Sequence, residues 1–230
     1  MKHLPVFDKF PQFANSLEFF KKKFFCVPFL AAFNTLTVLM LVCLSLYAKL
    51  NKQGDAVERL FSDPFNVWFP YEGILTGVSE VLWCIPVATC AFTFGLLRQK
   101  EPRSRSAIFL FFSALLLGVF FLDDRFRITL ILSRLGISIK FIYLCYGTAV
   151  FLYGVQFWRY IKTTPYLPLV LAFLLFAISR FEDLFESQSL GVHAMLEDGT
   201  KLLALLNLAL YFLHICHQEI WRDLRPREKR

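Results

Sequence analysis

The sequence predicts an all-α protein: a polytopic transmembrane helix bundle with about six spans and an N-terminal interfacial amphipathic helix. Of its 230 residues, 57% are apolar and only 19% are charged, and the mean hydropathy is +0.52. Soluble domains carry about 25% charged residues and disordered chains are depleted in apolar ones, so both classes are excluded. Apolar runs close to 20 residues long recur along the chain, whereas barrel strands require apolar–polar alternation that this sequence lacks. The sequence therefore describes a helical membrane protein.

The first predicted element is an arm, residues 1–23, on the cytoplasmic face. Apolar residues recur there at steps of three or four and line one helix face. They are Phe7, Phe10, Phe13, Leu17, Phe20 and Phe24. Lys21, Lys22 and Lys23 would contact anionic lipid headgroups. The arm either lies on the membrane and anchors the first span or docks a partner, such as another membrane subunit or a second copy in a homo-oligomer.

Six apolar stretches within residues 24–217 form the predicted membrane domain, because each approaches the length needed to cross a bilayer. They are Phe24–Tyr47, Ile74–Leu97, Ala107–Leu122, Ile139–Trp158, Tyr166–Ser179 and Leu202–His217. The third and fifth are short, and the third could continue through Asp123 and Asp124. Residues 218–230 form a basic cytoplasmic tail.

The loop charges predict the orientation. With both termini in the cytoplasm, 16 of the 25 Lys and Arg residues and only 6 of the 18 acids fall on the inner side. The net charge of +7 is therefore explained by topology, and no nucleic-acid partner is expected. These features fit a multi-pass protein of a bacterial plasma (inner) membrane. The six cysteines lie in or beside predicted spans, so we expect free thiols.

Acidic residues from several spans converge at one predicted depth, near the outer face. The cluster consists of Glu80, Asp123, Asp124, Glu197 and Asp198. Ionisable groups at membrane depth are costly unless they are paired, hydrated or functional. Because hard divalent cations take oxygen ligands, these five residues are predicted metal ligands, and a divalent cation is the one cofactor predicted. The alternative is structural: Glu197 and Asp198 would start the last helix, and Glu197–Lys201 and Arg180–Asp183 would form local pairs.

The segment Arg125–Ser138 is predicted to be a helix in the outer interface, covering the acidic cluster. The segment is mostly apolar and is interrupted by Arg125, Arg127 and Arg134. Arginine binds carboxylates and phosphates bidentately. These arginines, together with Lys201, are therefore predicted either to bind lipid phosphates or to pair with acids such as Asp123 and Asp124.

Three motifs in the second half of the chain resemble a group of uncharacterised bacterial multi-pass membrane proteins. They are Asp123-Asp124-Arg125-Phe126, then Leu135-Gly136-Ile137 followed by Tyr143 and Tyr146-Gly147, then Glu197-Asp198-Gly199-Thr200-Lys201. That group carries His-Glu where this chain has Thr129 and Leu130. The resemblance implies a membrane fold and no particular reaction. A remoter likeness to ceramidase-type membrane hydrolases lacks the Ser, Asp and three-His set of that superfamily.

Three functional classes remain. The first is a non-catalytic membrane protein, namely a sensor, a lipid- or cation-binding protein, or a subunit of a membrane complex. The second is a metal-assisted, membrane-embedded hydrolase acting on a lipid or lipid-linked substrate, for which no catalytic residues can be named. The third is a channel or carrier, which the absence of inverted repeats disfavours. The first class is preferred.

Overall fold

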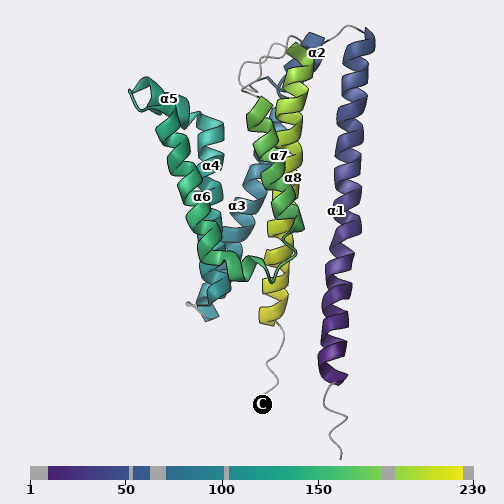
Figure 1. Cartoon of the computed structure of the whole chain (residues 1–230), viewed down its shortest axis with the longest axis vertical. Coiled ribbons are helices and arrows are strands. Elements are labelled where there is room, and N and C mark those ends of the chain that lie inside the picture. Colours follow the sequence, from purple (N-terminus) through teal and green to yellow (C-terminus); the bar gives the residue numbers. More distant parts are fainter. Residues whose placement is uncertain (1–9, 52–53, 63–70, 101–103, 183–189, 225–230) are drawn as a thin grey trace, which may run out of the picture.

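A computed structural model describes residues 10–51, 54–62, 71–100, 104–182 and 190–224. Side chains are described within these ranges except at 10–27, 29, 48, 54–55, 100, 180–182 and 190–196. Every element in this part of the chain is a helix, as the sequence predicts, and the long helices run roughly along one axis (Figure 1). They are α1 (Phe10–Asn51), α2 (Gly54–Leu60), α3 (Ile74–Lys100), α4 (Arg105–Phe126), α5 (Ile128–Arg134), α6 (Ile139–Ile161), α7 (Leu167–Glu182) and α8 (Leu190–Leu224).

The six predicted spans correspond to α1, α3, α4, α6, α7 and α8. Five of these helices contain segments long and apolar enough to cross a membrane, and α7 contributes a shorter apolar segment, Leu167–Ser179. Helix α4 continues through the two aspartates to Phe126, which is the longer of the two alternatives predicted for the third span. The last span differs from prediction, because α8 begins at Leu190 rather than Leu202.

The predicted arm and the first span are one helix in the structure. Helix α1 runs without interruption from Phe10 to Asn51 and contains Pro28. Residues 1–9 lie outside the described part of the chain. The membrane-surface position of the arm stays a prediction.

The core lies where α3 packs against α4 and α8, and α7 packs along α8. Phe109 of α4 is fully buried and contacts the rings of Tyr153, Phe157, Tyr160 and Phe212. This aromatic cluster holds α4, α6 and α8 together near the C-terminal end of α8. A polar network reinforces the same end.

Glu219 of α8 is the centre of that network. Its carboxylate, which is buried, accepts a hydrogen bond from Tyr160 Oη at 2.9 Å and another from Arg222 at 2.5 Å. Arg222 also donates to Ser106 Oγ at 3.2 Å. Helices α4, α6 and α8 are thus fastened at one end, and toward α5 the α4–α6 pair diverges from α7 and α8 (Figure 1).

Helix α1 stands to one side of the bundle and is attached by a reciprocal amide pair (Figure 1). Asn34 Nδ2 donates to Asn207 Oδ1 at 3.0 Å, and Asn207 Nδ2 donates to Asn34 Oδ1 at 2.7 Å. Asn207 is fully buried, so this pairing satisfies amide groups that would be costly to leave alone inside a membrane. Most other α1 side chains that are described are exposed, as expected of a lipid-facing helix.

The α1 and α8 ends that lead to the two chain termini lie at the same end of the bundle, and α5 lies at the opposite end (Figure 1). This arrangement agrees with an even number of crossings. Five cysteines, Cys43, Cys84, Cys90, Cys145 and Cys216, are free thiols as predicted. Cys26 lies outside the described side chains.

Candidate functional site

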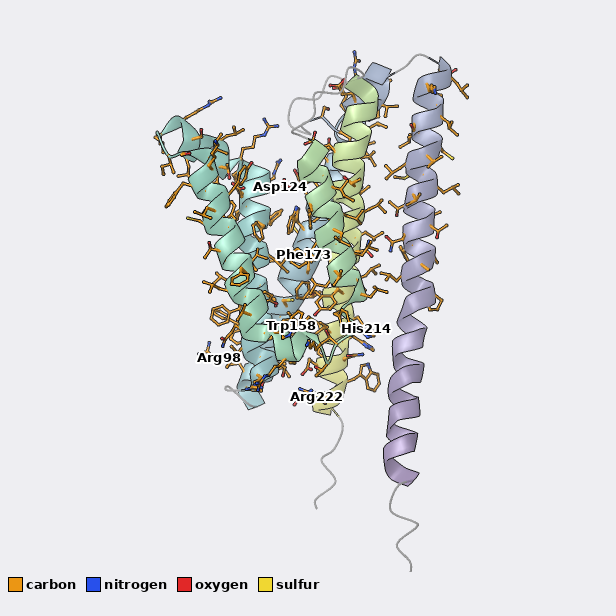
Figure 2. The ribbon with its side chains drawn as sticks, viewed as in Figure 1. Arg98, Asp124, Trp158, Phe173, His214 and Arg222 are labelled. Atoms are coloured by element: carbon orange, nitrogen blue, oxygen red, sulfur yellow. The ribbon has the colours of Figure 1, made fainter. Side chains whose placement is uncertain are left out.

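A cavity of about 1070 Å³ lies between the α4–α6 pair and the α7–α8 pair, with α3 forming a further wall. We call it the central cavity. Aromatic and aliphatic side chains form most of its walls, including Phe120 of α4, Val150 of α6 and Phe173 of α7. In Figure 2, Asp124 lies nearer the α5 end than Phe173 does. The central cavity occupies the space that opens as α4 and α6 diverge from α7 and α8.

The central cavity extends far along the bundle. Ile139 and Tyr153 of α6 both line it, and their separation of 14 positions corresponds to about 21 Å of helix. Half of a bilayer core of about 30 Å is about 15 Å. The cavity is therefore at least as deep as the acyl layer of one leaflet.

Charged side chains gather at the α5 end of the central cavity. We call them the charged layer: Glu80, Asp123, Asp124, Arg125, Arg127, Glu197, Asp198 and Lys201, all of which line the cavity. The layer includes the five acids predicted from sequence to lie together. Arg134, predicted with the other bases, is exposed at the last position of α5 and does not line the cavity.

Glu80 of α3 is paired with Arg125 of α4. The Arg125 guanidinium donates to Glu80 Oε1 at 2.7 Å, and the two side chains are 17% and 26% exposed. From sequence, Arg125 was predicted either to bind lipid phosphates or to pair with an acid such as Asp123 or Asp124, and the acid that it contacts is Glu80. Arg125 is one position beyond Asp124 on the same helix, and its side chain instead reaches across to α3.

Asp124 joins three helices. Its Oδ1 accepts from Lys201 Nζ of α8 at 2.5 Å, and its Oδ2 accepts from Trp83 Nε1 of α3 at 3.1 Å. The sequence offered Glu197 as the local partner of Lys201. Among the described ion pairs, Lys201 is instead paired with Asp124. The other predicted local pair, Arg180–Asp183, lies outside the described side chains.

Asp123 binds the start of α5. Its Oδ1 accepts from the Thr129 backbone N–H at 2.6 Å, and Thr129 Oγ1 lies 2.8 and 2.9 Å from the two carboxylate oxygens. Arg127, the residue before α5, makes no side-chain cap of its own. Asp123 therefore satisfies a backbone donor that the helix start leaves open.

Glu197 and Asp198 lie about two turns inside α8, because that helix begins at Leu190. The prediction that they start the last helix was therefore wrong, and a helix N-terminus does not explain them. Both line the central cavity beside Lys201. Their charges belong to the charged layer.

Within the described part of the chain, no three His, Cys, Asp or Glu side chains meet in a way that could hold a metal ion. Two of the predicted ligands, Glu80 and Asp124, instead accept hydrogen bonds from Arg125 and Lys201. The role of the five acids as metal ligands stays a prediction.

Some lining residues were not predicted from sequence to belong to the site. Trp83 follows Glu80 by three positions and so shares its helix face, which is a spacing that could have marked it. Its ring stacks on Phe176 of α7 with centroids 5.8 Å apart. The cavity is also lined by Thr129, Tyr143, Tyr146 and Phe173. Whether such residues face the cavity depends on how the helices diverge.

Residues 30–215 match the family model described as Domain of unknown function (DUF8692). The chain belongs to the DUF8692 family. The match covers every helix of the bundle in whole or in part, and the entire charged layer. No curated protein and no solved structure is significantly similar to the chain. Its apolar helices agree with an integral, multi-pass membrane protein.

Proposed function

We propose that this DUF8692 protein binds a membrane lipid in the central cavity, with the headgroup at the charged layer and an acyl chain between α6 and α7. The supporting observation is the division of one cavity into a charged end and a long apolar remainder. This division matches an amphiphile, because ligand sites are mostly apolar with a few convergent polar groups. Lipid binding is one of the non-catalytic roles predicted from sequence.

Side-chain exposure supports access from the bilayer. Tyr143 of α6 and Phe173 of α7 both line the central cavity, yet they are 51% and 47% exposed. Helices α6 and α7, which carry these two residues, diverge from each other toward α5 (Figure 1). An acyl chain could thus enter sideways from the leaflet that adjoins the charged layer, without crossing the charged residues.

Close packing at the end of the bundle opposite α5 supports a binding cavity rather than a channel. There the Phe109 ring cluster and the Glu219 network hold α4, α6 and α8 together. In the charged layer, Glu80 and Asp124 are already engaged by Arg125, Lys201 and Trp83. This favours a binding role over metal-assisted hydrolysis.

The test is photo-crosslinking in nanodiscs that contain a phospholipid with a diazirine in its acyl chain. We expect adducts on cavity residues of α6 and α7, mapped by mass spectrometry. Val150→Trp should reduce these adducts at least fivefold, because Val150 lines the cavity. Val155→Trp is the matched control, since Val155 is on the same helix, 62% exposed and outside the cavity lining. Adducts confined to the outer surface, or equal in both variants, would exclude lipid binding in the cavity.

A further inference from the structure

Resting on the proposed lipid binding, we infer that the lipid is a zwitterionic phospholipid with a primary amine in its headgroup. Asp123 binds the ammonium group and Arg127 binds the phosphate. The inference rests on a difference within the charged layer. Glu80 and Asp124 have cationic partners in the protein, whereas Asp123 and Arg127 have no oppositely charged partner among the described residues.

Asp123 differs from Glu80 and Asp124 in having neutral partners. Glu80 is paired with Arg125 and Asp124 with Lys201. The polar partners described for Asp123 are all neutral: the backbone N–H and the hydroxyl of Thr129, and the hydroxyl of Tyr146. Among the described residues, no cationic group lies within ion-pair distance of Asp123.

The Asp123 carboxylate also retains room for a further donor. An ionised carboxylate offers about four acceptor positions, whereas the neighbouring residues supply three hydrogens, two from Thr129 and one from the Tyr146 hydroxyl. A primary ammonium has three N–H donors and carries the missing positive charge. It therefore supplies what Asp123 lacks.

Arg127 is the complementary group. It lines the central cavity, and its backbone is left-handed, with φ 50° and ψ 44° at the junction of α4 and α5. An arginine seldom adopts this conformation, and here it turns the chain between the two helices. Its guanidinium has no acceptor among the residues that the structure describes, so its planar donor fork can take a phosphate in bidentate form.

Asp123 and Arg127 thus present opposite charges, four positions apart in the sequence, at the charged end of the central cavity. A headgroup with only a phosphate would leave Asp123 uncompensated. A quaternary choline group carries the charge but has no N–H to donate. A primary amine beside a phosphate satisfies both residues, and charge-assisted hydrogen bonds are the stronger kind.

The experiment uses the full chain in nanodiscs with three probes that share one diazirine acyl chain and differ in headgroup: ethanolamine, choline or glycerol. At equal mole fraction, we expect cavity adducts of the ethanolamine probe to exceed those of the other two about tenfold, which corresponds to about 1.4 kcal/mol. Asp123→Asn should reduce this preference to about twofold or less. Arg127→Gln should lower cavity labelling by all three probes to a similar extent, because all contain a phosphate.

Arg134→Gln is the matched control, since Arg134 is an exposed arginine of α5 outside the cavity lining, and it should change nothing. If Asp123→Asn does not fold, the headgroup order in the unmodified protein and the Arg127→Gln variant still decide the question. Cavity labelling that is equal for the three headgroups, or strongest for glycerol or choline, would overturn the amine assignment and leave the proposed function standing. Absence of cavity labelling by any probe would overturn the proposed function as well.

Discussion

Lys201 Nζ of α8 donates to Asp124 Oδ1 of α4 at 2.5 Å. The contact joins two helices through residues that lie 77 positions apart in the sequence. The two side chains are 22% and 21% exposed. Trp83 holds the second oxygen of Asp124, so the contact also includes α3. The charged layer is therefore part of the structure of the bundle, and removing one charge should disturb the charge that remains.

This pair predicts a measurable coupling in stability. Asp124→Asn and Lys201→Met should each lower the Tm in detergent, because each leaves a partly buried charge without its partner. The double variant should be more stable than the sum of the single effects by about 0.5–3 kcal/mol, as is typical of contacting residues. The comparison requires reversible unfolding monitored by circular dichroism. Lys140→Met, at an exposed position of α6, is the control, and additive effects would contradict the pairing.

Divalent cations distinguish ion pairing from the metal site predicted from sequence. Because Glu80 and Asp124 already have cationic partners, we expect Mg²⁺ or Ca²⁺ to leave the Tm of the unmodified protein unchanged. Arg125→Ala should lower the Tm and should make it rise again on addition of Mg²⁺, since Glu80 is then uncompensated. Arg134→Ala should do neither. Stabilisation of the unmodified protein by Mg²⁺, lost in Asp124→Asn, would instead support a metal site.

The spans could be predicted from sequence because crossing a bilayer imposes a length and a composition on each helix. The start of α8 could not be predicted in this way. Glu197, Asp198 and Lys201 interrupt its apolar pattern, although they line a cavity rather than contact lipid. Hydropathy does not distinguish these two surroundings, so the apolar span was predicted to begin at Leu202, 12 residues after the start of α8.

The membership of the charged layer could largely be predicted, whereas its pairing could not. Sequence spacing identifies neighbours along one helix, and it offered Glu197 as a partner for Lys201 and the adjacent aspartates as partners for Arg125, in each case as one of several alternatives. The actual partners come from other helices. They depend on how each helix is rotated and tilted, which no local pattern specifies. The central cavity also depends on helix tilt, because it lies where α4 and α6 diverge from α7 and α8.

A close contact between α1 and α8 predicts a steric rescue. A Cβ atom added at Gly199 would lie 3.2 Å from Leu41 Cδ1 and 3.3 Å from Cδ2. Gly199→Ala should be nearly neutral, because the helix gain of about 1 kcal/mol is offset by displacement of Leu41. Gly199→Ile should lower the Tm, and Leu41→Ala in the same chain should restore part of the loss. Gly147→Ile is the control, since nothing lies within 4 Å of that added Cβ.

The orientation of the bundle decides which leaflet supplies the proposed lipid. The structure places α5 at the end of the bundle opposite the chain termini (Figure 1), and 16 of the 25 Lys and Arg residues fall on the side predicted to be cytoplasmic. We therefore expect Arg134→Cys to react with a membrane-impermeant maleimide on intact cells, and Arg98→Cys to react only after permeabilisation. The unmodified chain provides the background, since its described exposed thiols Cys43, Cys84 and Cys145 lie within spanning segments. The reverse labelling pattern would place the charged layer at the cytoplasmic face.

The labelling result also assigns the leaflet. Because the central cavity begins at the charged layer and is about as deep as one leaflet, a charged layer at the cytoplasmic face would mean that the lipid comes from the inner leaflet instead of the outer one.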